Sequence, residues 1–143
     1  MKIAPLKGKT AFASTMRTGK RFTSHTITAI VTFRMSSEHR GIPAAGDAGS
    51  TIILGVSIRK KTAKKSTVRN RAKRLLRQSV RMVMREFSDA GIFAEGCPFD
   101  KIIVFSNSAP PVASLLHLEN ILGDVRAVLQ AAYDYSQKYS LAQ

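Results

Sequence analysis

Apolar residues recur along this chain with two different spacings. They alternate with polar or small residues from Phe22 to Phe33 and from Thr51 to Ile58, a period of two that is typical of β-strands. Along Val68–Phe87 and Leu115–Ala132 they recur every three or four residues, which is the period of an amphipathic helix. The pattern therefore predicts strands in the first half of the chain and two long helices in the second half.

Shorter elements complete the predicted fold. Lys7–Met16 is expected to form a helix that ends at Gly19, and the continuous apolar run Lys101–Ser106 is typical of a buried strand. Three further segments are predicted to be a loose end at 1–6, a flexible surface loop at 36–50 and a polar tail at 136–143. This order of elements indicates one α+β domain over residues 1–143, in which helices pack on a single sheet.

The charge of the chain is concentrated in one stretch. Arg59–Arg85 holds 12 of the 23 Lys and Arg residues and none of the 9 acids, so the rest of the chain is nearly neutral. On the predicted helix, basic residues recur every four positions, and each like-charge pair costs an isolated helix roughly 0.2–0.5 kcal/mol. The members of this row are Arg69, Lys73, Arg77, Arg81 and Arg85. A helix that acted alone would gain nothing from such a row.

The start of this helix carries a second anomaly. Ser66 or Thr67 is expected to cap it, yet Arg69 and Arg71 follow in a first turn where the helix dipole favours acidic residues. Phosphate groups would remove both anomalies, because the free N–H groups at a helix start and the Lys and Arg side chains all bind phosphate. We therefore predict that this helix lies against nucleic acid. The alternative is a basic face that contacts only solvent.

The sequence offers no set of groups suited to catalysis by the protein alone. Its acids do not cluster, its three histidines have no ligand spacing around them, and no glycine-rich phosphate loop is present. The single cysteine, Cys97, excludes an internal disulfide and is expected to be an inert apolar residue in a reducing compartment. No apolar run approaches about 18 residues, so we expect neither a membrane span nor export. We also expect no catalytic residue, no metal site and no cofactor bound by the protein alone.

The sequence VRNRAKRLLRQSVR, at Val68–Arg81, resembles the signature of the protein subunit of bacterial ribonuclease P. The similarity extends backward through LGVSIRKK at Leu54–Lys61, which is similar to a strand of that family ending in Ser and paired lysines. It extends forward through FDKIIVF to the last helix. Phe12, Gly19 and Lys20 fit the opening helix and turn of the family, so the resemblance covers most of the chain.

This resemblance implies a small basic protein that assists a catalytic RNA. That RNA removes the 5′ leader of precursor tRNA with Mg²⁺ that it holds itself. The expected partners are therefore the catalytic RNA and precursor tRNA in the cytoplasm, without a membrane or a protein partner. The fold implied is a two-layer sandwich with a mostly antiparallel four-stranded sheet and an unusual left-handed strand-helix-strand crossover. The residues expected to bind RNA are Lys60, Lys61, Lys64, Lys65, Arg69, Asn70, Arg71, Lys73, Arg74, Arg77 and Arg81.

The resemblance also implies a cleft on the open face of the sheet for the single-stranded leader. Its expected lining is Phe12, Met16, Phe22, Ile27, Ile30 and Ser57. The family usually has aromatic residues where Met16 and Ile27 stand. Because stacking is worth about 1–3 kcal/mol per base, this cleft should hold the leader more weakly than an aromatic one. For Phe12 and Phe22, core packing is an equally supported alternative, since groove walls and core walls have similar compositions.

Other classes of function fit parts of the sequence. The main alternative is a structural RNA-binding protein of the ribosomal type, which would share the basic helix but need no leader cleft. A nuclease that worked without RNA should show clustered carboxylates, which the sequence lacks. A basic amphipathic helix lying on an anionic membrane is the least favoured class, because the apolar side of this helix is needed to pack on the sheet.

Overall fold

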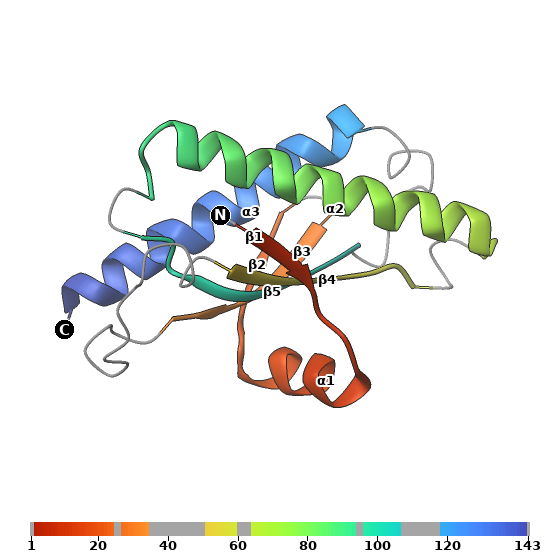
Figure 1. The fold of residues 1–143 in the computed structure, drawn as a ribbon, viewed down its shortest axis with the longest axis horizontal. Coiled ribbons are helices and arrows are strands. Elements are labelled where there is room, and N and C mark those ends of the chain that lie inside the picture. Colours follow the sequence, from red (N-terminus) through yellow and green to blue (C-terminus); the bar gives the residue numbers. More distant parts are fainter. Residues whose placement is uncertain are drawn as a thin grey trace.

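The computed structural model describes residues 2–24, 27–34, 51–59, 64–93, 96–106 and 118–142. The loop expected at 36–50 lies outside these residues. The elements are β1 (Lys2–Pro5), α1 (Lys9–Thr18), β2 (Lys20–Thr23), β3 (Ile27–Phe33), β4 (Thr51–Ser57), α2 (Ser66–Asp89), β5 (Phe99–Ser106) and α3 (Leu118–Ala142). Figure 1 shows that α2 and α3 cover one face of the sheet, whereas the short α1 lies on the opposite face.

The strands form one sheet in the order β1-β4-β5-β3-β2. β4 lies between β1 and β5 and runs parallel to both, whereas β3 pairs antiparallel with β5 and with β2. The expected sheet of four mostly antiparallel strands was therefore wrong in two respects, since a fifth strand is present and half of the pairings are parallel. β4, α2 and β5 form the expected strand-helix-strand unit, and its left hand stays a prediction.

The fifth strand is β1, a segment expected to be a loose end. Lys2 to Pro5 pair in register with Thr51 to Leu54 of β4, and the backbone N–H of Leu6 donates a further hydrogen bond to the carbonyl of Leu54. A four-residue strand is too short to show a period of two, and its partner lies about 50 residues further along the chain. Nothing local in the sequence could therefore reveal it.

The main core lies between the sheet and the two long helices. The periodic apolar stripe predicted for α2 is confirmed, because its members every three or four residues are buried. The buried apolar residues of α2 are Ala72, Leu76, Val80, Val83, Met84 and Phe87. Those of α3 are Ile121, Val125, Val128, Leu129 and Ala132, and β3 and β5 supply Ile27, Ala29, Val31, Ile102 and Val104. Removing this apolar surface from water is the main force that holds α2 against the sheet.

Two glycines let α1 lie close to the other face of the sheet. A Cβ atom added to Gly55 would meet the Phe12 ring at 3.0 Å and the Leu6 side chain at 3.1 Å, and one added to Gly19 would clash with Ile30. Gly19 ends α1 as predicted, with a φ of −80° that any residue adopts, so glycine is required there for space rather than for backbone conformation. Gly55 therefore provides space that the side chains of Phe12 and Leu6 occupy.

The ends of the long helices differ from the expectation. Lys65, and neither Ser66 nor Thr67, is the N-cap of α2, and no side chain caps that end. α3 continues through Ala142, so most of the expected polar tail at 136–143 is helical. Polarity alone does not end a helix, and this segment contains neither Gly nor Pro to stop it.

Candidate RNA interface

The cationic side of α2 follows directly from the burial of its apolar stripe. Because the helix has 3.6 residues per turn, the residues between the buried positions point away from the sheet. Arg74, Arg77, Arg81 and Arg85 are all exposed, and their spacing of three and four residues puts them on one side of the helix. The helix therefore presents a continuous basic surface over about three turns.

This basic surface faces away from α3. On the α3 side, Arg126 makes a bidentate salt bridge with Glu86, with its Nη2 2.7 Å from one carboxylate oxygen and 2.9 Å from the other. On the opposite side, Arg81 and Arg85 border the N-terminal strand β1, beside Lys2 and Ile3. One flank of α2 is thus paired with a helix, whereas the other is positively charged and open.

The start of α2 lacks the groups that usually satisfy a helix N-terminus. The first turn contains no acidic residue, and the N-cap residue Lys65 makes no side-chain capping bond. Arg69 instead folds back, and its Nη1 donates a hydrogen bond of 2.8 Å to the carbonyl of Lys64. The positive end of the helix dipole and the exposed Lys64 and Lys65 therefore reinforce one another at this end.

The structure gathers most of the predicted RNA-binding residues on α2 and just before it. The exposed members are Lys64, Lys65, Asn70, Arg71, Arg74, Arg77 and Arg81, and the half-buried members are Arg69 and Lys73. Lys60 and Lys61 lie outside the described residues. Arg85 extends the same surface and Lys2 of β1 lines the pocket beside it, and neither was among the predicted residues. Arg85 belongs to the i, i+4 row that the sequence shows, whereas no sequence signal places Lys2 beside it.

Four of the six residues predicted for the leader cleft lie either on α1 or on the face of the sheet that α1 covers. Phe12 lies half-buried over Gly55, and Met16, one turn later on the same side of α1, is 37% exposed. Ile30 is buried beneath the end of α1. Ser57 lies two residues beyond Gly55 on the same face of β4 and is half-buried.

Phe22 and Ile27 lie on the opposite face, so the structure does not bring the six residues together. Ile27 is 0% exposed within the core between the sheet and the helices. The ring of Phe22 packs edge-on against Phe33 and against Tyr135 of α3. Phe22 therefore packs against the core, which was the alternative left open for it. Ile27 and Ile30 are three apart in a strand and must point to opposite faces.

Phe105 belongs to the α1 face and was not predicted. In the register of the sheet it lies between Ser57 of β4 and Thr28 of β3, in the row next to the one that α1 covers. Its ring is half-buried, and the guanidinium of Arg21 lies 5.8 Å from the ring centre. The apolar run KIIVFS predicts a strand buried on both faces, so it gave no sign that Phe105 points to a less covered face.

Groups that could act in catalysis are not gathered in the described part of the chain. Its His, Cys, Asp and Glu residues form no group of three that could hold a metal ion. Burial raises the pKa of the Cys97 thiol to about 11, so this thiol stays protonated at neutral pH and is a poor nucleophile. Among the same residues, no helix has the length and apolar character needed to cross a bilayer.

Comparisons with known proteins identify the family. A family model described as Ribonuclease P matches residues 1–130. The ribonuclease P protein of Staphylococcus aureus has a similar structure, with 18% identity, a TM-score of 0.60, and coverage of 90% of this chain and 94% of that one. A mutant of that protein with defective mRNA degradation activity aligns with a TM-score of 0.58 and 18% identity, over 90% of this chain and 86% of the other. No curated protein matches. The chain belongs to the Ribonuclease P family, as a protein component of the bacterial enzyme.

Proposed function

We propose that this protein binds the catalytic RNA of ribonuclease P through α2 and the 5′ leader of precursor tRNA through the α1 face of the sheet. As the protein subunit it is part of an endoribonuclease complex. In the proposed arrangement the RNA subunit cleaves the leader in the cytoplasm, and the protein raises the affinity of the complex for its substrate. The product is the mature 5′ end of tRNA.

The observation that carries the proposal is the unpaired basic surface of α2. Arg74, Arg77 and Arg81 have no salt-bridge partner among the described residues, although like charges at this spacing destabilise a helix. Phosphates of an RNA would neutralise these side chains, and the release of counterions from the RNA would drive binding. Repulsion between these like charges destabilises the free protein, and binding to a polyanionic partner would remove that repulsion.

A second surface supports binding of the leader. α1 lies on the opposite face of the sheet from α2, so both surfaces are accessible at the same time (Figure 1). Met16, Phe12 and Phe105 provide apolar side chains at or near the surface, and Arg21 adds a positive charge beside Phe105. Aromatic rings with adjacent arginines bind single strands with little dependence on sequence, which suits leaders of differing sequence.

We assign the Mg²⁺ of the reaction to the RNA rather than to protein side chains. Magnesium takes oxygen ligands, usually one or two carboxylates with phosphates and water. The described acids are spread over α2, β5 and α3, and no three metal-ligating residues gather there, which supports leaving the metal to the RNA. The protein contributes positioning and charge, and the RNA contributes the chemistry.

Reconstitution tests this division of roles. Purified protein, catalytic RNA and precursor tRNA are combined at low Mg²⁺, and cleavage of the leader is measured with each component omitted in turn. We expect cleavage at low Mg²⁺ only when protein and RNA are both present. Cleavage by the protein without RNA would overturn the assignment of the chemistry to RNA. An RNA-binding protein of the ribosomal type would bind RNA without stimulating cleavage.

A further inference from the structure

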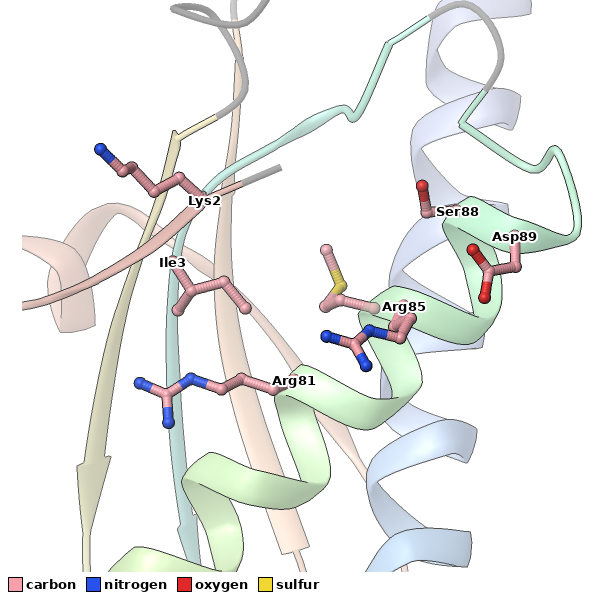
Figure 2. A pocket seen from close by; sticks show the side chains of 7 residues that line it. Lys2, Ile3, Arg81, Arg85, Ser88 and Asp89 are labelled. Carbon is pink, nitrogen blue, oxygen red and sulfur yellow. The ribbon is translucent and has the colours of Figure 1, made fainter.

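A groove between β1 and α2 is lined by residues of two elements far apart in sequence, and three of these residues are cationic. It has a volume of about 430 Å³ and is lined by Lys2, Ile3, Arg81, Met84, Arg85, Ser88 and Asp89. Figure 2 shows Arg81 and Arg85 reaching from α2 toward the strand that carries Lys2 and Ile3, whereas the Lys2 side chain extends from the rim of the groove away from α2. The family-like signature, which ends at Arg81, does not account for Lys2 or Arg85.

The chemistry of the lining fits a phosphodiester segment of an RNA strand. Lys2, Arg81 and Arg85 are exposed, and none of them has a salt-bridge partner within the described ranges. The guanidinium groups are planar forks suited to phosphate oxygens, whereas the lysine acts as a point charge. Ile3 is half-buried, so the groove also has apolar wall atoms against which a sugar or base can lie, and Met84 is buried beneath them. A volume of this size lies in the range of sites for small ligands.

Asp89 is the one group in the lining that opposes an anion. It is exposed, it stands four residues after Arg85, and no salt bridge joins the two side chains. The formal charge of the lining is therefore positive, with three cations against one carboxylate. Neutralising Asp89 should raise the affinity for a polyanion, whereas removing a cation from the groove should lower it.

We propose that this groove binds the sugar-phosphate backbone of the catalytic RNA, so that the RNA interface extends from α2 onto the N-terminal strand. The proposal rests on the proposed function, since it adds contacts to the same RNA. The groove lies on the α2 side of the sheet, whereas the surface proposed for the leader lies on the α1 side. Precursor tRNA is a second possible source of phosphodiester, and the experiment separates the two sources.

The test is the salt dependence of binding to catalytic RNA alone and to precursor tRNA alone. The variants are Lys2→Ala, Arg85→Gln and Asp89→Asn. Lys138→Ala and Glu119→Gln, both on α3 and outside the groove, are the matched controls for the loss of a cation and of a carboxylate. Each lost phosphate contact lowers the slope of log K against log salt by roughly one unit. Thermal unfolding of every variant excludes misfolding as the cause.

We expect Lys2→Ala and Arg85→Gln each to lower the slope for catalytic RNA by about one unit, and Asp89→Asn to tighten binding by several fold. The controls should match the wild type. The proposal is overturned if the groove variants behave like their controls, or if the loss is confined to precursor tRNA. Arg74→Ala is measured in parallel, because loss of slope in that variant alone would preserve the α2 interface and reject only the groove. Absence of binding by the wild type would reject the proposed function itself.

Discussion

Individual arginines of the chain have different roles, although the sequence presents them as equivalent. Arg34 lies outside α2 and is structural, because its guanidinium donates hydrogen bonds to the carbonyls of Phe99 and Thr51 at 2.9 and 2.6 Å. Arg69 is partly structural, since it bonds the carbonyl of Lys64 at the start of the helix. Arg74 is exposed and has no such bond to another described residue. A basic residue can thus be assigned to RNA only after its protein contacts are known.

This difference predicts distinct results for two substitutions. Arg74→Ala should lower the salt slope for catalytic RNA by roughly one unit and leave the melting temperature unchanged. Arg69→Ala should lower the slope and also destabilise the fold by about 1 kcal/mol, the usual contribution of one hydrogen bond. Salt titrations and thermal unfolding of both variants check this. Equal melting temperatures would show that the bond to Lys64 contributes nothing, and unchanged slopes would show that both arginines face only solvent.

Phe105 and Met16 give a second prediction at the residue scale. Phe105→Leu keeps an apolar side chain but removes the flat ring, so affinity for precursor tRNA should fall by about 1 kcal/mol, the low end for one stacked base. Met16→Phe should raise that affinity by up to a similar amount, because methionine offers no flat face. Mature tRNA, which has no leader, is the control and should bind all three proteins equally. An equal change in affinity for precursor and mature tRNA would show that neither residue contacts the leader.

Cys97 gives a prediction about pH. Its pKa is raised from 9.0 to about 11 in the folded state, chiefly because burial disfavours the thiolate. Between these values the unfolded chain has lost the proton and the folded chain keeps it, so stability falls as pH rises through this window. The loss amounts to roughly 1.4 kcal/mol per pH unit. Urea unfolding between pH 8 and 11 should show this extra slope in the wild type relative to Cys97→Ala. Parallel curves would mean that the thiol ionises equally in both states.

At the scale of elements, sequence periodicity predicted the helices better than the sheet. The stripe of α2 was found because the same three- and four-residue spacing repeats from Val68 to Phe87. β1 was missed because four residues carry no period and the partner strand is distant in sequence. Ile27 and Ile30 were assigned to one cleft, although they lie three apart in β3 and so point to opposite faces. Ile27 lies under the long helices and Ile30 lies under α1, so apolar character did not distinguish a core face from a cleft face.

The uncapped start and basic side of α2 predict that anions stabilise the protein. A site that binds sulfate only in the folded state adds about 2.7 kcal/mol at 100 times its Kd. We expect a melting temperature several degrees higher in sulfate than in chloride at matched ionic strength. Sulfate also stabilises proteins in general, so the control is the double variant Arg74→Gln and Arg77→Gln, which should show a smaller rise. An equal rise in the two proteins would indicate only the general effect.

At the scale of the whole molecule, the fold separates two surfaces. The basic side of α2 and the α1 face lie on opposite sides of the sheet, which holds them at a fixed distance (Figure 1). Periodicity and charge predicted the basic helix, the resemblance predicted the family, and the family match confirmed the family. The position of the second surface could not be derived from sequence, because it depends on which face of the sheet α1 covers. That choice depends on the close approach of α1 at Gly19 and Gly55, which only the folded chain reveals.

The most direct test of the central claim is the dependence of substrate affinity on leader length. Precursor tRNAs with progressively shorter leaders, and mature tRNA, are titrated with catalytic RNA in the presence and absence of the protein. If the protein contacts the leader while α2 holds the catalytic RNA, it should raise the affinity for precursor tRNA but not for mature tRNA. The gain should disappear when the leader is cut to one or two nucleotides. A gain that is the same for mature tRNA and for every leader length would contradict the account, because the protein would then act only as a general cation for the RNA.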